Sequence, residues 1–125
     1  MDTDKINEAE LTQKIIGCAY TVSNSLGSGF LEKVYENALA IELRKNKLSY
    51  QQQSPVKVRY DGIIVGEYVS DLVVESKVLI ELKACKAIDD THVAQCLNYL
   101  KATSLQLGLI INFGRSKIEI RRLVL

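Results

Sequence analysis

The segment Asp71–Lys83 reads DLVVESKVLIELK, and its pattern decides the fold. Two apolar triplets, Leu72–Val74 and Val78–Ile80, predict a pair of buried strands. Side chains alternate faces along a strand, so Glu81 and Lys83 point the same way. Two acids and a lysine projecting from an apolar sheet are costly to bury unless something uses them. A divalent metal and a phosphate would use them.

The loop between these strands determines whether the two acids share a face. Asp71 lies opposite Glu81 if Val74 pairs with Val78, which leaves Glu75-Ser76-Lys77 as a three-residue loop. A two-residue loop would put the acids on opposite faces. Three-residue loops favour a left-handed residue, usually glycine, and this loop has none. We predict the three-residue loop, which a register shifted by one residue without a bulge would contradict.

Composition is that of a globular protein. The 125 residues suit one domain, and they are 47% hydrophobic and 25% charged. No apolar run approaches the roughly 20 residues that span a bilayer, and the polar start, MDTDKINEAE, is not a signal peptide. We expect a single cytoplasmic domain over residues 1–125, not associated with a membrane, with residues 1–9 as a flexible tail.

Net charge and cysteine content bear on three classes of function: nucleic-acid binding, zinc binding and thiol catalysis. The net charge of +1 gives no general electrostatic footprint for nucleic acid. Cys18, Cys85 and Cys96 form neither a CxxC pair nor a zinc pattern, so we interpret them as reduced thiols. An enzyme that uses Cys85 as a nucleophile beside His92, the only histidine, remains an alternative.

Periodicity along the chain predicts an α/β domain with a mixed sheet flanked by helices, in the order ααββββαββ. The three helices are separated from their neighbours by glycines or capped by aspartate, and the first two strands are joined by an Asp61-Gly62 hairpin turn after an extended connector over 51–55. The helices are expected at 10–26, 30–46 and 89–103, and the strands at 56–60, 63–68, 69–74, 78–84, 107–112 and 117–123.

Polar residues on two of these helices accompany the strand segment. His92, Gln95 and Tyr99 are spaced i, i+3, i+7 and share one helix face, which suits binding a phosphate or orienting a lysine. Simple exposure of that face is the alternative. On the second helix, Glu32, Tyr35 and Glu36 are spaced i, i+3, i+4, so the tyrosine and one of the two acids could face inward. An amphipathic helix with solvated acids is the alternative there.

Together these residues resemble the GxxExxY protein family, within the PD-(D/E)xK nuclease-like superfamily. Gly29, Glu32 and Tyr35 supply the naming motif, and Asp71 followed by Glu81-Leu82-Lys83 matches the superfamily acid and its ExK element.

The resemblance covers residues 10–125 and extends to the third helix. Gln95 and Tyr99, in AQCLNYLKAT, look like the QxxxY element of exonuclease-type branches, and LGLIINFG at 107–114 is also typical of the family. Two positions depart from the pattern. Ser70 stands where the superfamily name has proline, and Ser23-Asn24 stand where many relatives have histidine and a basic residue.

The resemblance implies a restriction-endonuclease-like core and metal-dependent hydrolysis of phosphodiester bonds in nucleic acid. Asp71, Glu81 and the carbonyl of Leu82 would ligate Mg²⁺ or Mn²⁺, with Glu32 completing the shell directly, through water or at a second metal. Lys83 would orient the attacking water or stabilise the developing negative charge.

Further residues are assigned around this centre. Gln95 and Tyr99 would position Lys83 or a phosphate oxygen, and Tyr35 and His92 are candidate substrate contacts. The rival reading is a non-catalytic module that binds nucleic acid or protein through a retained nuclease-like core. A homodimer is a further expectation, because the apolar C-terminal strand, 118–125, would form a sheet edge.

Overall fold

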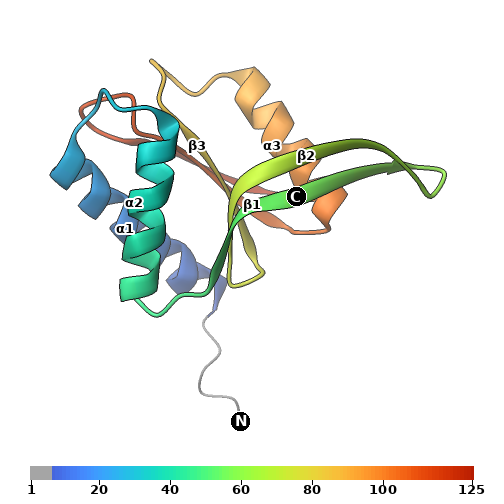
Figure 1. Ribbon diagram of the computed structural model, residues 1–125, viewed down its shortest axis with the longest axis horizontal. Coiled ribbons are helices and arrows are strands. Elements are labelled where there is room, and N and C mark those ends of the chain that lie inside the picture. The colour runs from blue at the N-terminus through green and yellow to red at the C-terminus, as the bar shows by residue number, and fades with distance from the viewer. Residues whose placement is uncertain (1–6) are drawn as a thin grey trace, which may run out of the picture.

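The structure is a computed structural model that describes residues 7–125 (Figure 1). Its five strands form one mixed sheet in the order β1-β2-β3-β4-β5, in which β3 and β4 are parallel and all other neighbours are antiparallel. The predicted mixed sheet flanked by helices is therefore confirmed. The elements are α1 (Glu8–Leu26), α2 (Glu32–Lys45), β1 (Tyr50–Tyr60), β2 (Ile63–Val74), β3 (Val78–Lys83), α3 (Asp90–Thr103), β4 (Leu107–Asn112) and β5 (Glu119–Val124).

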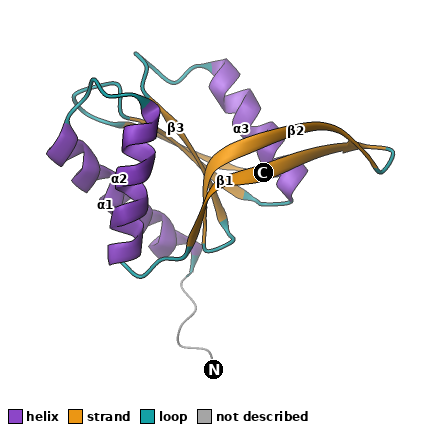
Figure 2. Cartoon of the chain, in the orientation of Figure 1, coloured by secondary structure: helices purple, strands orange, loops and turns teal. Residues whose placement is uncertain are grey.

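Helices cover both faces of this sheet. The pair α1 and α2 lies on one side and α3, which connects the parallel strands β3 and β4, lies on the other (Figures 1 and 2). Each side has its own apolar core. Alternate residues of β3 enter the two cores, Ile80 the one under α1 and α2 and Leu79 the one under α3. A face of the sheet is identified below by the helices that cover it.

The predicted order ααββββαββ contains one strand too many. Residues 63–68 and 69–74 form the single strand β2. The chain makes no turn between Tyr68 and Val69, and the pairing with β1 continues across this point. The expected connector 51–55 is likewise part of β1. Its proline, Pro55, is tolerated because β1 is an edge strand, where a missing backbone donor need not break the ladder.

The end of β1 and the start of β2, residues 56–68 with the turn between them, form a hairpin arm that projects from the body of the molecule (Figure 1). Asp61 and Gly62 close it with φ angles of 52° and 78°, as the predicted hairpin turn requires. The register shifts between Val58 and Arg59. Several apolar side chains of the arm face solvent, including Tyr60, which is 71% exposed, and Ile63, which is 68% exposed.

The arm also rotates about its own axis where it leaves the body. Leu72 enters the core under α1 and α2, whereas the ring of Tyr68, four residues earlier, lies 5.7 Å from that of Tyr99 on α3. Residues four apart normally share a face of a strand. Between them, Asp71 lies across from Gln53 of β1, whose φ of 52° breaks the regular strand.

The helix termini follow recognisable capping rules. The Asn7 side chain accepts a hydrogen bond from the Glu10 amide at 2.9 Å, so α1 begins at Glu8 and the predicted tail of residues 1–9 is too long. The rest of that tail, residues 1–6, lies outside the described residues. Asp89 caps α3, as predicted. Within residues 7–125, no helix combines the length and apolar character needed to cross a bilayer.

Candidate active site

The loop between β2 and β3 has the predicted length. Val74 pairs with Val78, and Leu72 pairs with Ile80. This register, continued by one residue, brings Asp71 opposite Glu81. The predicted register is therefore confirmed.

Side-chain contacts take the place of the missing glycine in this loop. Glu75 and Ser76 have left-handed φ angles of 54° and 52°. The Glu75 carboxylate accepts hydrogen bonds from the amide and the hydroxyl of Ser49, both at 2.6 Å, and the Glu75 amide donates to the Ser49 carbonyl at 2.9 Å. These bonds offset the cost of the unusual backbone and hold the two acids in register.

The carboxylate pair Asp71 and Glu81 lies on the face covered by α3. The Asp71 Oδ2 atom accepts a hydrogen bond from the Leu82 amide at 2.7 Å. Glu81 is only 7% exposed, and its Oε1 atom has no hydrogen-bond partner. A buried carboxyl oxygen without a partner is uncommon and costly, so this atom is the strongest sign of a ligand in the structure.

The electrostatics of the pair point the same way. Burial raises the pKa of Glu81 to about 9, and the neighbouring charge of Asp71 and its hydrogen bond add to the increase. The ammonium of Lys83 acts in the opposite direction, and the more distant Glu32 contributes least. At neutral pH the pair therefore holds a proton on Glu81. A divalent cation would replace that proton, because its charge favours both carboxylates in their ionised form.

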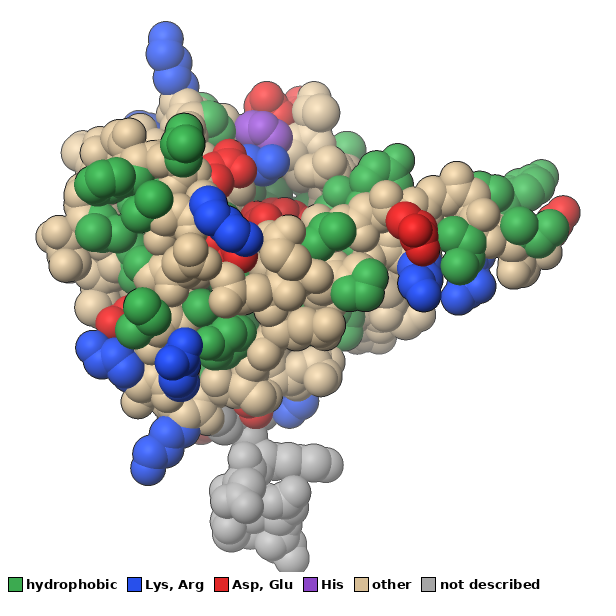
Figure 3. Space-filling view, viewed as in Figure 1, with side chains coloured by type: hydrophobic (Ala, Val, Ile, Leu, Met, Phe, Trp, Pro, Cys, Tyr) green, Lys and Arg blue, Asp and Glu red, His purple; other side chains and the backbone are tan. Residues whose placement is uncertain are grey.

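The donor set fits a hard cation of the Mg²⁺ or Mn²⁺ type, because it consists of two carboxylates and the buried Glu81 Oε1 atom has no other partner. It is not a complete cage. Within the described part of the chain, no group of three or more His, Cys, Asp or Glu side chains is arranged to hold a metal ion. In the space-filling view, acidic side chains gather near the middle of the visible face, with a basic side chain and the histidine close by (Figure 3).

Glu32 does not join the carboxylate pair. It occupies the first turn of α2, on the other side of the sheet, and is exposed. There it borders a hollow of about 490 Å³ together with Phe30, Ala84 and Gly114, beyond the end of β3. Its charge nevertheless reaches Glu81, whose pKa it raises by the smallest of the contributions. The place of Glu32 in a metal shell therefore stays a prediction.

Helix α3 brings Tyr99 and Gln95 to this face. Tyr99 is 8% exposed, and burial raises the pKa of its hydroxyl, with further increases from the charges of Glu81, Tyr68 and Asp71. Gln95 is exposed, one turn earlier on the helix. Tyr99 therefore neighbours the carboxylate pair. Among the described residues, neither Tyr99 nor Gln95 is hydrogen-bonded to Lys83, so the role of Gln95 stays a prediction.

His92 and Tyr35, the two predicted substrate contacts, have structural partners instead. His92 completes the capping box of α3: its Nδ1 atom accepts from the Asp89 amide at 3.2 Å, and its own amide donates to Asp89. Tyr35 is fully buried and stacks on Phe113, with ring centroids 4.6 Å apart. Its hydroxyl donates to the Gly27 carbonyl at 2.6 Å. The role of His92 and Tyr35 as substrate contacts stays a prediction.

Glu36 is a buried acid on the same helix as Tyr35, and the sequence assigned it no role at a site. Its carboxylate accepts from the amides of Gln52 and Gln53, both at 2.7 Å, and from the Lys33 ammonium at 3.0 Å. Adjacent strand residues normally point to opposite faces, so the left-handed φ of Gln53 is what lets both amides reach the same acid. The sequence left open which acid of α2 faces inward beside Tyr35, and the structure shows that it is Glu36 rather than Glu32.

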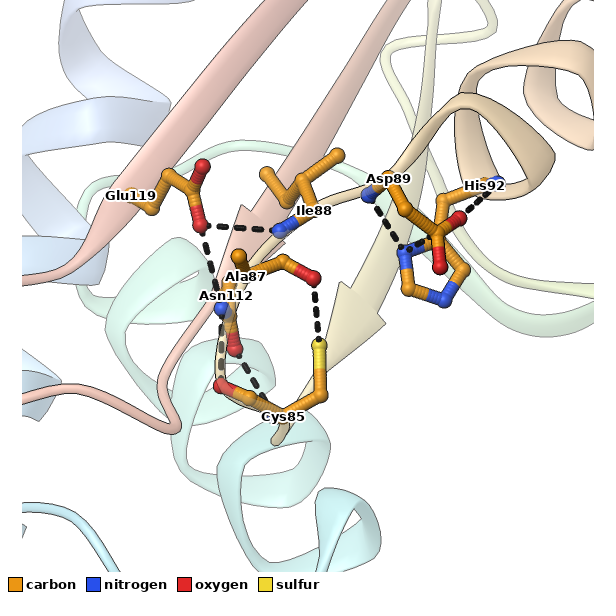
Figure 4. Close-up of polar contacts among 7 residues, drawn as sticks. All are labelled: Cys85, Ala87, Ile88, Asp89, His92, Asn112 and Glu119. Carbon is orange, nitrogen blue, oxygen red and sulfur yellow. Dashed lines mark hydrogen bonds and ion pairs between the residues drawn. The ribbon is translucent and has the colours of Figure 1, made fainter.

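A second unforeseen network holds the segment between β3 and α3 (Figure 4). Asn112 is fully buried; its Oδ1 atom accepts from the Cys85 and Gly114 amides, and its Nδ2 atom donates to the Cys85 carbonyl and to Glu119. Glu119 also accepts from the Ile88 amide at 2.9 Å. A Cβ atom at Gly114 would lie 2.2 Å from the Cys85 carbonyl oxygen, so only glycine fits.

The same view bears on the thiol alternative. The Cys85 thiol bonds to the Ala87 carbonyl at 3.3 Å, and the His92 ring belongs to the α3 cap (Figure 4). Among the contacts of residues 7–125, none joins the thiol to the imidazole. A nucleophile and its base should lie within hydrogen-bond reach, so this pairing has no support.

Comparisons with known proteins agree with this geometry. A protein of known crystal structure named SSO0001 aligns with a TM-score of 0.54 and 18% sequence identity, over 94% of this chain and 58% of that one. The two share a fold, and this chain spans little more than half the length of that relative. No curated protein gives a significant match. The family model described as PD-(D/E)XK nuclease superfamily matches residues 9–123, so the chain belongs to that superfamily, and the predicted restriction-endonuclease-like fold is confirmed.

Proposed function

We propose that this protein is a metal-dependent nuclease that hydrolyses phosphodiester bonds in nucleic acid. Membership of a nuclease superfamily supports the class of substrate. The observation that carries the proposal is the buried pair Asp71 and Glu81, in which one Glu81 oxygen has no partner and a cation would neutralise the two adjacent negative charges. Gly29, Glu32 and Tyr35 further support a GxxExxY-type member of the superfamily.

The roles of the residues follow from their positions. Asp71 and Glu81 would hold Mg²⁺ or Mn²⁺, with the Leu82 carbonyl as a further donor and Glu32 acting from the rim. When bound, the cation would supply an activated water and neutralise charge on the phosphate. Lys83 shares the face of Glu81 and would stabilise the negative charge that develops on the phosphate oxygens.

Two residues of α3, Tyr99 and Gln95, would contact the phosphate. The Tyr99 hydroxyl lies within electrostatic reach of both carboxylates and would donate a hydrogen bond to a phosphate oxygen. Gln95, one turn earlier and exposed, would orient the same phosphate through its amide. Both are positioning roles, so their loss should reduce cleavage less than loss of Asp71 or Lys83.

Substitution of the acid and the lysine tests this proposal. Asp71→Ala and Lys83→Ala should each abolish cleavage of labelled DNA and RNA in the presence of Mn²⁺, with the fold retained by circular dichroism. Asp61→Asn and Lys86→Ala are matched controls, because both residues are exposed and lie outside the site. Wild-type cleavage by either Asp71→Ala or Lys83→Ala would remove the nuclease proposal.

The second candidate is a non-catalytic binding module with a nuclease-like core. The lack of a third clustered ligand within residues 7–125 and the near-neutral net charge favour it. Calorimetric titration with Mn²⁺ separates the two. A nuclease should bind the ion and lose binding in Asp71→Ala, whereas the non-catalytic module should give no heat in either protein.

Two further expectations belong to this proposal. The strand β5 is an edge of the sheet, with Val124 and Leu125 exposed, and its pairing with a second copy would give a homodimer. Sedimentation analysis tests this, and a monomer at all concentrations would rule it out. A cytoplasmic location stays a prediction.

A further inference from the structure

A groove of about 850 Å³ runs between the hairpin arm and α3. Tyr99 and Gln95 are among the residues of α3 that line it. The same Tyr99 lies within electrostatic reach of Asp71 and Glu81. Tyr99 therefore borders both the groove and the carboxylate pair, so a ligand lying in the groove would pass beside the candidate active site.

The charge of the groove suits a polyanion. Lys57 and Arg59 line it on the arm and Lys101 lines it on α3, so basic residues stand on both walls. No Asp or Glu is among the described residues that line it. Because the chain as a whole has a net charge of only +1, this local excess is a property of the groove rather than of the protein surface in general.

The rest of the lining is aromatic and apolar. Tyr68 is 51% exposed, and its ring meets that of Tyr99 at 5.7 Å and 37°. Val58, Ala94 and Ala102 contribute apolar surface nearby. A duplex keeps its bases stacked inside and offers only sugars and phosphates to such a wall, whereas an unpaired strand offers base faces that stack on aromatic rings.

We propose that this groove binds single-stranded nucleic acid and leads it to the carboxylate pair; the second half of this statement rests on the nuclease function proposed above. One base stacks on Tyr68. Arg59 and Lys101 bind phosphates on the two sides of the groove. The substrate class is thereby narrowed from nucleic acid in general to an unpaired strand or a frayed end.

Binding without chemistry tests the groove by itself. Fluorescence anisotropy in EDTA measures the Kd of a short labelled single strand, as DNA and as RNA, and of a hairpin duplex of the same sequence. The tighter of the two single strands should bind at least about tenfold more tightly than the duplex, and Tyr68→Ala should weaken it by about tenfold, the loss typical of one stacked base. Tyr60→Ala is the matched control, because Tyr60 is exposed on the arm but does not line the groove.

The basic walls have a separate readout in the salt dependence of binding. The double variant Arg59→Ala with Lys101→Ala should reduce the slope of log Kd against log salt by roughly 1.4, since each lost phosphate contact on a single strand contributes roughly 0.7. Arg121→Ala with Arg122→Ala, two exposed residues of β5, should leave the slope unchanged.

A variant that fills the groove tests the same proposal without removing a side chain that could also stabilise the fold. A Cβ atom at Gly66 would meet only Tyr68 at 3.5 Å and Val58 at 3.9 Å, so a side chain fits there and points into the groove. Gly66→Leu should abolish single-strand binding with an unchanged circular dichroism spectrum. Duplex binding as tight as single-strand binding, or wild-type Kd values in both Tyr68→Ala and Gly66→Leu, would overturn the proposal.

The nuclease function and the groove can fail independently. If Tyr68→Ala loses single-strand binding but the wild type cleaves nothing with Mn²⁺, the groove stands and the nuclease proposal falls. If the wild type cleaves and Gly66→Leu binds and cleaves single strands equally well, the nuclease stands and the groove falls.

Discussion

Glu81 and Glu36 are both buried acids, 7% and 3% exposed, and they lie on opposite faces of the sheet. Glu36 accepts three hydrogen bonds, one of them from a lysine. Glu81 lies beside a second carboxylate and keeps one oxygen without a partner. The fold thus satisfies one buried carboxylate completely and leaves the other incomplete. Burial alone does not distinguish these two acids. The number of hydrogen bonds that each carboxylate accepts does.

The two acids are connected through the arm. Gln53, which bonds to Glu36, lies across from Asp71 at the point where β1 and β2 rotate. The satisfied acid therefore holds the backbone irregularity that places the unsatisfied pair. Disturbing Glu36 should change both stability and the geometry of the site, whereas neutralising Glu81 should relieve a cost.

The largest expected effect is the pH dependence of stability that Glu81 causes. Its pKa is about 9 in the folded protein and near 4.5 in the unfolded chain, so between these values the folded state holds one more proton. Stability therefore falls as pH rises through this window, by up to about 1.4 kcal/mol per pH unit. Urea unfolding of the wild type and of Glu81→Gln should diverge with rising pH, the variant being the more stable.

Glu32→Gln is the control for this measurement, because it removes a charge from an exposed acid. It should follow the wild type within about 0.5 kcal/mol at every pH. Parallel curves for the wild type and Glu81→Gln would show that Glu81 is ionised in the folded protein and would contradict the contrast with Glu36.

Removal of the satisfied acid should have the next largest effect. Glu36→Ala removes the acceptor of three hydrogen bonds and leaves the Gln52 amide only its bond to Asn37, so it should lower the free energy of unfolding by about 2 kcal/mol. Glu42→Ala, on the same helix, removes only the ion pair with the exposed Lys45 and should cost less than about 1 kcal/mol. Equal losses in the two variants would mean that Glu36 is no more than a surface acid.

A cation should stabilise the protein through the unsatisfied acid alone. At ten times its Kd, Mn²⁺ should raise the free energy of unfolding by about 1.4 kcal/mol, because it binds only the folded state. Calorimetric melting should show the increase in the wild type and in Lys86→Ala but not in Asp71→Asn. An identical increase in Asp71→Asn would place the ion elsewhere.

The smallest effect concerns Glu75, an acid satisfied at the surface. The hydrogen bonds from Ser49 lower its pKa, so its contribution is present at neutral pH and is lost as pH falls through the lowered value, opposite in sign to Glu81. Glu75→Gln should cost less than about 1 kcal/mol at pH 7 and nothing in strong acid. A cost that persists in acid would show that the loop depends on shape rather than on charge.

The sequence was sufficient for the elements whose physics is local. The apolar triplets gave β3 and the end of β2, Asp61-Gly62 gave the hairpin turn, and Asp89 gave the start of α3. The register between the acids was predicted from the assumption that they share a face, since only a three-residue loop puts Asp71 opposite Glu81, and the structure has that register. The roles of those residues in catalysis stay predictions.

What the sequence did not provide depends on contacts between distant segments. Glu32 and Glu36 are one helical turn apart, and only the rotation of α2 against β1 decides that Glu36 faces inward. Two predicted strands merge into β2 because its pairing with β1 continues across their predicted boundary, and that pairing is a contact between separate segments. Asn112 and Gly114 hold Cys85 through backbone contacts that no spacing rule anticipates.

The projecting arm has a consequence for how the molecule opens. Its outer residues, such as Tyr60 and Ile63, are exposed, whereas the strands under the carboxylate pair are buried on both faces. Backbone amides near the arm tip should exchange with solvent deuterium through local fraying, while those of Ile80 and Ile110 should exchange only when the whole domain unfolds. The substrate groove would then have one mobile wall and one rigid wall, so a strand could enter sideways instead of threading from an end.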